Sequence, residues 1–397
     1  MSANSQLKRR FYQLVRCTVF ISLCLGAWSQ QAVAQITTQS LDTFSATQRN
    51  LRFSSISTEQ GLSQDSVTAM RQDPRGFIWI GTQEGLNRFD GQAIQSFVRD
   101  PFDSSSLAHN WIWSLLITDA GELWVGTEAG ISIHDRSTDS FKNLRHNPND
   151  PNSISSDRVK VLFQDSARNI WVGTINAGVN RIDAATGQVH RYAFDEDDPT
   201  SIPDDAVLSI TEDRQGRVWI GFDGGGIALY DSATNKFIRN PFQPNDYELS
   251  YESITAIVED HALDGHLWVG SRDGGLFRLN TNASTLERFS HKSNDYLSIS
   301  NNYIRDILQD RDGTLWVATD EGLNEWQPDS EHFSRYYADP SDPTSLSENR
   351  TTRLFESSDG VLWIGTYAGV NTWNFLSDAF VQYQSKNGVL GLSLIHI

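Results

Sequence analysis

Cysteine and methionine are nearly missing from this chain of 397 residues, which contains two of each. So few cysteines exclude a disulfide-stapled scaffold and a zinc domain with cysteine ligands. Basic residues are also in deficit, with 32 Lys and Arg against 50 Asp and Glu. Because nucleic-acid binding needs clustered Lys and Arg, the net charge of −18 argues against a nucleic-acid partner.

Motifs for catalysis and metal binding are missing as well. The nine histidines are scattered, without the His-Glu-x-x-His spacing of zinc enzymes, and no Gly-x-Ser-x-Gly nucleophile motif occurs. No loop carries the closely spaced carboxylates that a calcium site requires. The sequence therefore predicts no catalytic residue, no metal and no cofactor in this chain.

The first 34 residues have the pattern of a secretory signal peptide. A basic region ends at Arg16, an apolar run covers residues 17–28, and Ala32-Val33-Ala34 offers a small-residue cleavage site. The apolar run is shorter than the ~20 residues of a membrane-spanning helix. Cleavage after Ala34 would remove both cysteines and leave 28 basic against 50 acidic residues, a net charge of −22. We expect export to the periplasm or the extracellular space; an uncleaved anchor is the alternative.

The last residues do not have the pattern of a folded segment. Residues 391–397 end without a turn, cap or polar tail, and residues 392–397 resemble a translated transposon end. We expect a truncated or artefactual tail here, with the natural protein continuing further. The expected division is a signal peptide at 1–34, a linker at 35–50, one domain at 51–384 and this tail at 385–397.

The domain at 51–384 consists of seven copies of one unit. Each copy contains a Trp followed by a branched apolar residue, a small residue and usually Thr. The seven tryptophans are Trp79, Trp124, Trp171, Trp219, Trp268, Trp316 and Trp363, at spacings of 45, 47, 48, 49, 48 and 47 residues. Repetition at so even a period is typical of stacked repeat architectures.

Every copy predicts four short strands. An apolar run leads to an acidic Gly turn, the Trp strand, a second Gly turn, a third strand and a more polar fourth strand. The fourth strands are centred on Phe97, Phe141, Tyr192, Phe237, Phe289, Tyr336 and Tyr383. Four short strands per ~47 residues indicate an all-β fold, a seven-bladed β-propeller of four-stranded antiparallel blades. The repeated tryptophans are then structural, buried between blades.

The ends of such a ring must be joined. Residues 51–57 form a spare strand ahead of the first copy, and they could complete the outer edge of the last blade. A strand at residues 380–383 is the alternative, so closure by residues 51–57 is a hypothesis.

The repeat resembles the two-component regulator propeller repeat. The resemblance rests on the acidic Gly turn at 73–76, the segment Trp79-Ile80-Gly81-Thr82 and the segment 85–90, and it extends over residues 51–384. Departures are mild: Phe222 and Ser271 replace Thr, Ala318 replaces Gly, and Asn169 stands where other copies place a turn glycine. The resemblance implies the exported sensing region of a bacterial membrane receptor, whose output is a histidine kinase or a diguanylate cyclase.

A ligand site is expected at one mouth of the ring. The residue just before each inner strand varies between copies, and these residues should form a ring around the channel. Stacking faces and positive charge come together in a candidate site for a small anion or acidic saccharide. Its members are Trp111, Trp113, Arg158, Lys160, Tyr303, Arg305 and Arg350. The alternative is that these aromatics pack under connectors and that each Arg pairs with a nearby Asp.

These observations lead to one functional prediction and two alternatives. We expect an extracytoplasmic ligand-sensing propeller of a signalling receptor, present as an N-terminal fragment and anchored in the inner membrane only through a missing segment. The expected partner is an oligosaccharide or other small molecule, with an acidic one favoured; a homodimer is one arrangement open to the full-length receptor. A secreted propeller enzyme, either lyase or glycan hydrolase, and a passive protein-interaction scaffold remain the alternatives.

Overall fold

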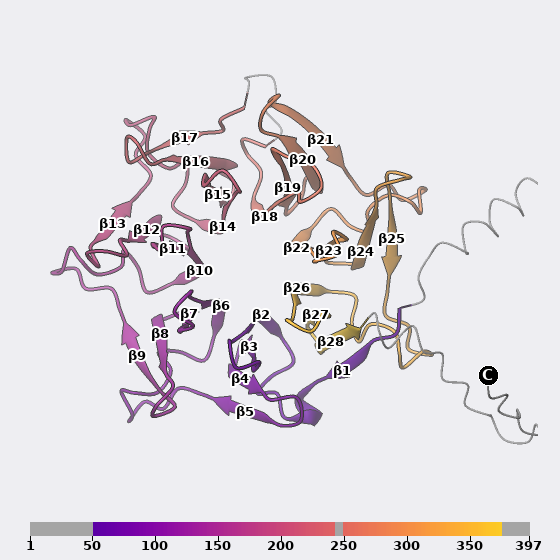
Figure 1. Cartoon of the computed structure of the whole chain (residues 1–397), viewed down its shortest axis with the longest axis horizontal. Helices are drawn as coiled ribbons and strands as arrows, with labels where there is room; N and C mark the ends of the chain where they lie inside the picture. Colours follow the sequence, from indigo (N-terminus) through magenta and orange to yellow (C-terminus); the bar gives the residue numbers. More distant parts are fainter. Residues whose placement is uncertain (1–50, 243–248, 375–397) are drawn as a thin grey trace, which may run out of the picture. The chain divides into compact units, whose positions relative to one another are not determined.

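Seven four-stranded antiparallel sheets form the fold of residues 51–242 and 249–374, the part of the chain that the computed structural model describes. The sheets are the blades of a propeller around a central opening (Figure 1). In blades 1 to 6 the first strand along the chain lies at the opening, and the following strands lie successively further out. Blade 7 has the same order for its first three strands and takes its outer strand from the start of the domain. The predicted fold, a seven-bladed β-propeller, is therefore confirmed.

The strands of the first four blades, from inner to outer, have the following bounds. Blade 1 contains β2 (Val67–Gln72), β3 (Ile78–Thr82), β4 (Gly85–Phe89) and β5 (Ile94–Phe97). Blade 2 contains β6 (Ile112–Ile117), β7 (Leu123–Thr127), β8 (Gly130–Asp135) and β9 (Ser140–Leu144). Blade 3 contains β10 (Val159–Gln164), β11 (Ile170–Thr174), β12 (Val179–Ile182) and β13 (Val189–Tyr192). Blade 4 contains β14 (Val207–Glu212), β15 (Val218–Phe222), β16 (Ile227–Asp231) and β17 (Lys236–Arg239).

The remaining blades follow the same order. Blade 5 contains β18 (Ile254–Glu259), β19 (His266–Ser271), β20 (Leu276–Asn280) and β21 (Thr285–Phe289). Blade 6 contains β22 (Ile304–Gln309), β23 (Leu315–Thr319), β24 (Gly322–Gln327) and β25 (His332–Tyr336). Blade 7 contains β26 (Thr351–Glu356), β27 (Val361–Thr366), β28 (Gly369–Asn374) and, as its outer strand, β1 (Ser54–Ile56).

The N-terminal strand β1 joins the two ends of the ring. Ser54, Ser55 and Ile56 pair antiparallel with Thr372, Asn371 and Val370 of β28, so the last blade takes its outer strand from the start of the domain. A short 3₁₀ turn, η1 (Thr58–Gln60), then leads toward blade 1. This is the arrangement that the closure hypothesis for residues 51–57 expects. The alternative strand at residues 380–383 lies outside the described residues, as do the expected signal peptide, linker and tail.

Close approach to the inner strands explains the Gly that stands two residues after the repeated Trp in most blades. A Cβ atom on Gly173 would lie 2.5 Å from Cγ1 of Val161 and 2.6 Å from Cγ1 of Val207 on the next inner strand. Blade 6 has Ala318 at this position, and the facing residue of blade 7 is Thr351. The hydroxyl of Thr351 accepts a hydrogen bond from the Thr319 N–H at 2.9 Å, so a polar contact replaces the apolar one.

The repeated tryptophans fill the space between blades. Six of them are 7% exposed or less, namely Trp79, Trp171, Trp219, Trp268, Trp316 and Trp363. In blade 3 the indole Nε1 donates to Asp165 Oδ2 at 2.8 Å, and the same Asp accepts from the backbone of its own turn. Trp124 is the exception: it is half-buried and donates to Glu122, because blade 2 has Thr118 in place of the turn Asp.

The turn of blade 3 corrects one detail of the sequence interpretation. The glycine of this turn stands three residues after the Asp and has a positive φ, as Gly216 does in blade 4 (74°). In blade 3 that position is Arg168, with φ 69°, and not Asn169. A non-Gly residue in the left-handed region carries a backbone cost, so blade 3 is mildly strained here.

A hydrogen bond recurs between blades at the end of the ring where the inner strands finish; we call this the far end. The last residue of an inner strand, Gln or Glu, accepts a backbone N–H from the preceding blade. The donor is the turn residue that follows the Asp, or that follows Thr118 in blade 2 and Ser357 in blade 7. We call this contact the latch. The six latches are Ser358 to Gln72, Asp119 to Gln164, Ser166 to Glu212, Arg214 to Glu259, His261 to Gln309 and Arg311 to Glu356, at 2.6–2.9 Å.

The seventh junction, between blades 1 and 2, lacks the latch for a chemical reason. The turn residue of blade 1 is Pro74, which has no backbone N–H to donate. The residue at the end of the facing inner strand is Ile117, which has no acceptor in its side chain. Donor and acceptor are thus both missing at the same junction.

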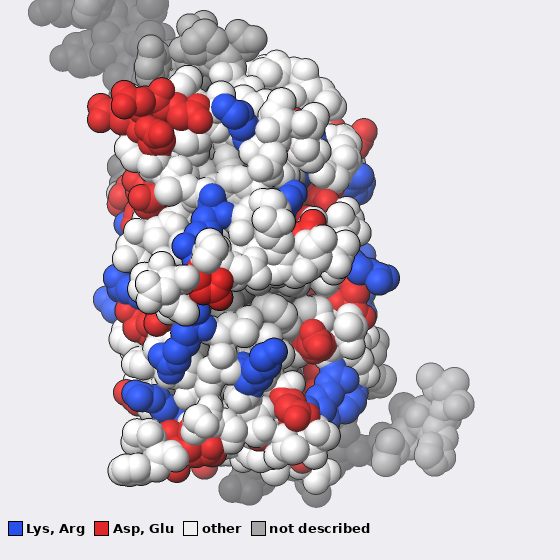
Figure 2. Space-filling view, turned by 90° about the vertical axis from the view of Figure 1, so that its left-hand side faces the viewer, with Lys and Arg blue, Asp and Glu red and all other residues white. Residues whose placement is uncertain are grey.

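Charges of both signs are interspersed on the side of the ring shown in Figure 2, with Lys and Arg beside Asp and Glu. Ion pairs among the described residues include Lys236 with Asp198 at 3.7 Å. In the described part of the chain no helix has the length and apolar character needed to cross a membrane.

Candidate functional site

The mouth of the ring is formed by two sets of residues that the fold joins. One set is the residue before each inner strand, and the other is the loop between the second and third strands of the same blade. In five blades the loop donates a backbone N–H to the carbonyl of the residue before the inner strand. These bonds run from Glu128 to Trp111, Ile175 to Arg158, Asp223 to Ala206, Arg272 to Ser253 and Asp320 to Tyr303, at 2.9–3.2 Å.

Four of the predicted site residues meet at the junction of blades 2 and 3. The rings of Trp111 and Trp113 lie with centroids 5.2 Å apart. Lys160 Nζ lies 4.0 Å from the centroid of the Trp113 ring, a cation–π contact. Glu128 joins the remaining member, since it accepts from Trp113 Nε1 at 2.8 Å and pairs with Arg158 at 2.5 Å.

The other three predicted residues meet at blades 6 and 7. The Arg305 guanidinium lies 4.5 Å from the Tyr303 ring and 5.5 Å from the ring of Tyr367. The Arg350 guanidinium lies 5.9 Å from the centroid of the same Tyr367 ring. Arg305 also forms an ion pair with Asp320. The structure therefore divides the predicted site into two groups, each centred on aromatic rings and cations.

Electrostatics connect the two groups across the ring. The pKa of Lys160 is lowered to about 7, first by burial and then by the charges of Arg353, Arg272 and Arg305, with Asp223 opposing. Lys160 belongs to blade 3 and these arginines belong to blades 5, 6 and 7, so cations from several blades lie within electrostatic reach of one another.

Ion pairs neutralise part of this positive charge, as the alternative interpretation of the sequence expected. Arg158 pairs with Glu128 and Arg272 pairs with Asp223 at 2.8 Å, both between neighbouring blades. Arg305 pairs with Asp320 within one blade. Lys160 has no ion pair among the described residues, although the charge of Asp223 favours its protonation.

Several residues of the site were not singled out from the sequence. Arg71, Asp306 and Arg353 lie on the inner strands β2, β22 and β26. The sequence feature that could have identified them is a charged residue inside a strand that is otherwise mostly apolar. Tyr367 and Glu128 lie in the loops between the second and third strands of blades 7 and 2 and were not predicted as site residues either. Their contacts with Arg305 and Arg158 cross between neighbouring blades.

A cleft of about 330 Å³ opens beside Trp111. It is lined by Gln83, Glu84, Arg99, Pro101, His109, Asn110 and Trp111, and so lies between blades 1 and 2. His109 Nδ1 accepts the backbone N–H of Trp111 at 2.9 Å, which places the ring proton of a neutral His109 on Nε2. The indole Nε1 of Trp111 is buried without a hydrogen-bond partner among the described residues.

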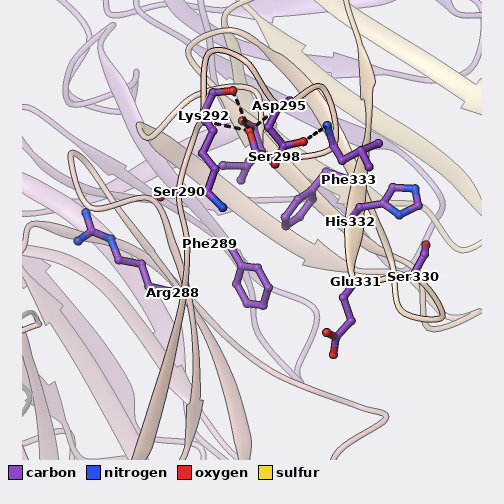
Figure 3. Close-up of a pocket in the computed structure, with 12 residues that line it drawn as sticks. Arg288, Phe289, Ser290, Lys292, Asp295, Ser298, Ser330, Glu331, His332 and Phe333 are labelled. Atoms are coloured by element: carbon purple, nitrogen blue, oxygen red, sulfur yellow. Dashed lines mark hydrogen bonds between the residues drawn. The ribbon is translucent and has the colours of Figure 1, made fainter. Parts of the chain in front are cut away.

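A second pocket of about 270 Å³ lies on the outer rim, where β21, the following connector and β25 meet (Figure 3). Ser298 holds this connector in place, since its hydroxyl accepts from the Lys292 N–H at 2.9 Å. Phe333 N–H donates to the Leu297 carbonyl at 2.9 Å and fixes the connector against β25. The same contact occurs in blades 2 and 4, so this pocket belongs to a repeated structural junction.

Fold and repeat together define the class of protein as a repeat propeller with a charged mouth. Five segments match the family model described as two-component regulator propeller: residues 61–84, 106–129, 201–224, 298–321 and 345–368. The chain therefore carries two-component regulator propeller repeats, as the sequence resemblance predicted.

Solved structures of extracellular domains share the fold of this chain. It is similar to the extracellular domain of a protein described as a hybrid two-component system from B. thetaiotaomicron, at 26% identity and TM-score 0.69. The match covers 81% of this chain and 42% of that domain, so the chain spans less than half the length of this relative. A second such domain from the same organism matches at 21% identity and TM-score 0.66, covering 81% of this chain and 39% of the other, and shows the same fold.

Two further matches are more limited. A segment of 59 residues is 42% identical to histidine kinase P4 of Formosa agariphila, covering 15% of this chain and 4% of that protein. A streptogramin B lyase matches at 14% identity and TM-score 0.60, covering 81% of this chain and 98% of the lyase. At that identity the likeness extends to the fold alone.

Proposed function

We propose that this chain is the extracytoplasmic ligand-sensing propeller of a bacterial membrane signalling receptor of the two-component or diguanylate cyclase type. The repeat family and the similarity to extracellular domains of two-component systems support a sensing role. Export by the N-terminal signal and an output domain beyond the propeller are parts of this proposal. The chain itself contributes recognition, and catalysis belongs to the output domain.

The observation that carries the proposal is the composition of the mouth. In a chain of net charge −18, the mouth gathers Trp111, Arg158, Tyr303 and Arg350 in equivalent positions of four blades. Tryptophan and tyrosine faces suit the C–H faces of sugar rings, and guanidinium groups suit carboxylates and sulfates. The ligand class that fits is an acidic oligosaccharide or another small anion.

Signalling from such a site requires two states. Blades 2 and 3 are linked at the mouth by the Glu128–Arg158 pair, and blades 4 and 5 by the Asp223–Arg272 pair. A ligand that competes for these arginines would change the packing between blades and against the downstream module. The energy available for signalling equals the difference between the ligand's affinities for the two states.

Calorimetric titration of the whole chain with acidic and neutral oligosaccharides tests the proposal. We expect saturable binding of acidic chains and at least a tenfold loss in the double variant Trp111→Ala with Arg350→Ala. The matched control is Arg168→Ala, an exposed arginine away from the mouth whose side chain is 73% exposed. Absence of binding to any saccharide, or equal affinity in the double variant and the control, would contradict the proposal.

A further inference from the structure

Charged side chains from opposite sides of the ring converge on the channel beneath the mouth. Arg71 lies on β2, Lys160 on β10, Asp306 on β22 and Arg353 on β26. Figure 1 shows these strands on different sides of the central opening. Three cations and one acid thus occupy the lining of a channel in a protein with a large excess of acidic residues.

The three cations have no carboxylate partner among the described residues. Arg71 donates to the carbonyl of Met70 at 2.8 Å. Arg353 donates to the carbonyls of Thr352 and Arg305 at 2.9 and 3.2 Å. Lys160 has only the Trp113 ring, at 4.0 Å. Since a guanidinium has five N–H donors, both arginines keep donors for a ligand.

Asp306 forms its hydrogen bonds with the backbone. Its carboxylate accepts the N–H of Leu354 at 2.9 Å and the N–H of Ile307 at 3.1 Å. Burial raises the pKa of Asp306 although Arg353 and Arg71 both act to lower it. The acid therefore offsets the positive charge of the channel only in part.

Unpaired cations in such a place carry an energetic cost that an anion would remove. Desolvation lowers the pKa of Lys160 to about 7, so its surroundings disfavour the charged amine. The pKa of Arg71 is lowered in the same direction, although Arg71 is exposed on β2. A bound oxyanion would accept hydrogen bonds from all three side chains and restore the balance of charge.

We propose that the channel beneath the mouth binds one oxyanion group, a sulfate, phosphate or carboxylate, between Lys160, Arg71 and Arg353, with Trp113 as one wall. The inference rests on the proposed function only for the source of the anion. The group either belongs to an oligosaccharide held at the mouth or is a free inorganic ion.

Binding at this site is coupled to protonation of Lys160. The charged groups that face Lys160 are Arg353, Arg272 and Arg305, which oppose its protonation, and Asp223, which favours it; Arg71 and Asp306 complete the charged lining. An anion adds negative charge beside the amine, so it raises the lysine pKa and draws in a proton near neutral pH. Affinity for the anion should therefore fall as the pH rises from about 7 toward 9.

The test is titration of the whole chain with sodium sulfate at constant ionic strength, followed by calorimetry in two buffers of different ionisation enthalpy. We expect saturable binding with net proton uptake near neutral pH, and a loss of tenfold or more in Lys160→Met and in Arg353→Met. The matched control is Lys142→Met on the outer strand β9, where the lysine is exposed. The control should bind sulfate like the natural chain.

The outcomes separate this inference from the proposed function. Sulfate binding that is absent, or that is equal in Lys160→Met and Lys142→Met, overturns the channel site even if saccharides bind at Trp111. Sulfate binding that is lost in Lys160→Met supports the channel site even if no saccharide responds to Trp111→Ala. Galacturonate and glucose are further probes that identify the source of the anion. If the anion is a group on a saccharide, galacturonate should bind in a way that depends on Lys160, and glucose should not bind there.

Discussion

The two ends of the ring differ in how much they repeat. At the far end, six of the seven junctions carry the latch, and most blades place an Asp under the Trp indole. At the mouth, the residue before the inner strand is Ser66, Trp111, Arg158, Ala206, Ser253, Tyr303 or Arg350. Contacts that hold blades together must recur in every blade, whereas recognition of an asymmetric ligand needs side chains that differ. The backbone of the mouth repeats as well, since a glycine of the mouth loop donates its N–H to the next blade at all seven junctions, for example Gly85 to Asn110 at 2.9 Å. Only the side chains at the mouth differ from blade to blade, which is the variation that recognition requires.

The largest difference in the free energy of unfolding is expected between a tryptophan of the blade interface and one of the mouth. Trp171→Ala should destabilise the ring by about 3–5 kcal/mol, because it removes a fully buried indole and leaves a cavity. Trp111→Ala should cost about 1 kcal/mol, since this residue is half-buried and its Nε1 has no partner to lose. Urea unfolding of the two variants measures the difference. Equal losses would remove the distinction between the ends.

Loss of one latch should have a smaller effect. Glu212→Ala leaves the Ser166 N–H without its acceptor, and we expect a cost of about 1–2 kcal/mol in the free energy of unfolding. Glu84→Ala serves as the control, because this carboxylate lies at the mouth in the cleft beside Trp111. A loss for Glu84→Ala as large as that for Glu212→Ala would contradict the assignment of stability to the far end.

The pH dependence of stability isolates Lys160. The folded-state pKa lies near 7 and the unfolded value near 10.5, so between these values the unfolded chain binds more protons. Stability should therefore rise with pH across this window. Below pH 7 the folded chain holds the charged Lys160 amine, and its destabilising effect should be fully present. Lys160→Met should remove that rise and stabilise the ring near pH 7 by on the order of 1 kcal/mol. Thermal unfolding from pH 6 to 10 checks this; parallel curves for the two proteins would refute it.

The smallest effect is expected from introducing a latch at the junction of blades 1 and 2, which has none. Ile117→Gln alone should gain nothing, because Pro74 has no N–H to offer. Combined with Pro74→Ser, the new amide should accept the new N–H, and a double-mutant cycle should show a favourable coupling of about 0.5–1 kcal/mol. A coupling of zero would mean that the six natural latches do not stabilise their junctions either.

Repetition explains which parts of the fold could be predicted. Trp171 and its equivalents identify the blades, because one local pattern predicts the same strand and turn in each of the seven copies. The half-buried Trp124 was not predicted. Thr118 replaces the Asp that would accept from its indole, and the indole donates to Glu122 instead. The replacement is visible in the sequence, but its effect on burial depends on packing.

The candidate site was predictable only in part. Equivalent positions in the repeat place Trp111 and Arg350 at one mouth, so their grouping follows from the period alone. Some contacts of the site residues cross between blades, as Glu128 contacts Arg158 and Tyr367 contacts Arg305. Contacts across a ring depend on how far each side chain reaches, and the repeat pattern contains no such information. For that reason Arg71, Asp306 and Arg353 were recognised only in the structure.

The most direct test of the charged channel is an NMR titration of the Lys160 amine in the whole chain, with Lys160→Met to assign the signal. The account predicts a pKa of about 7 in the free protein and a clear rise when sulfate is added. A pKa near the ordinary lysine value of 10.5 that sulfate does not change would contradict it.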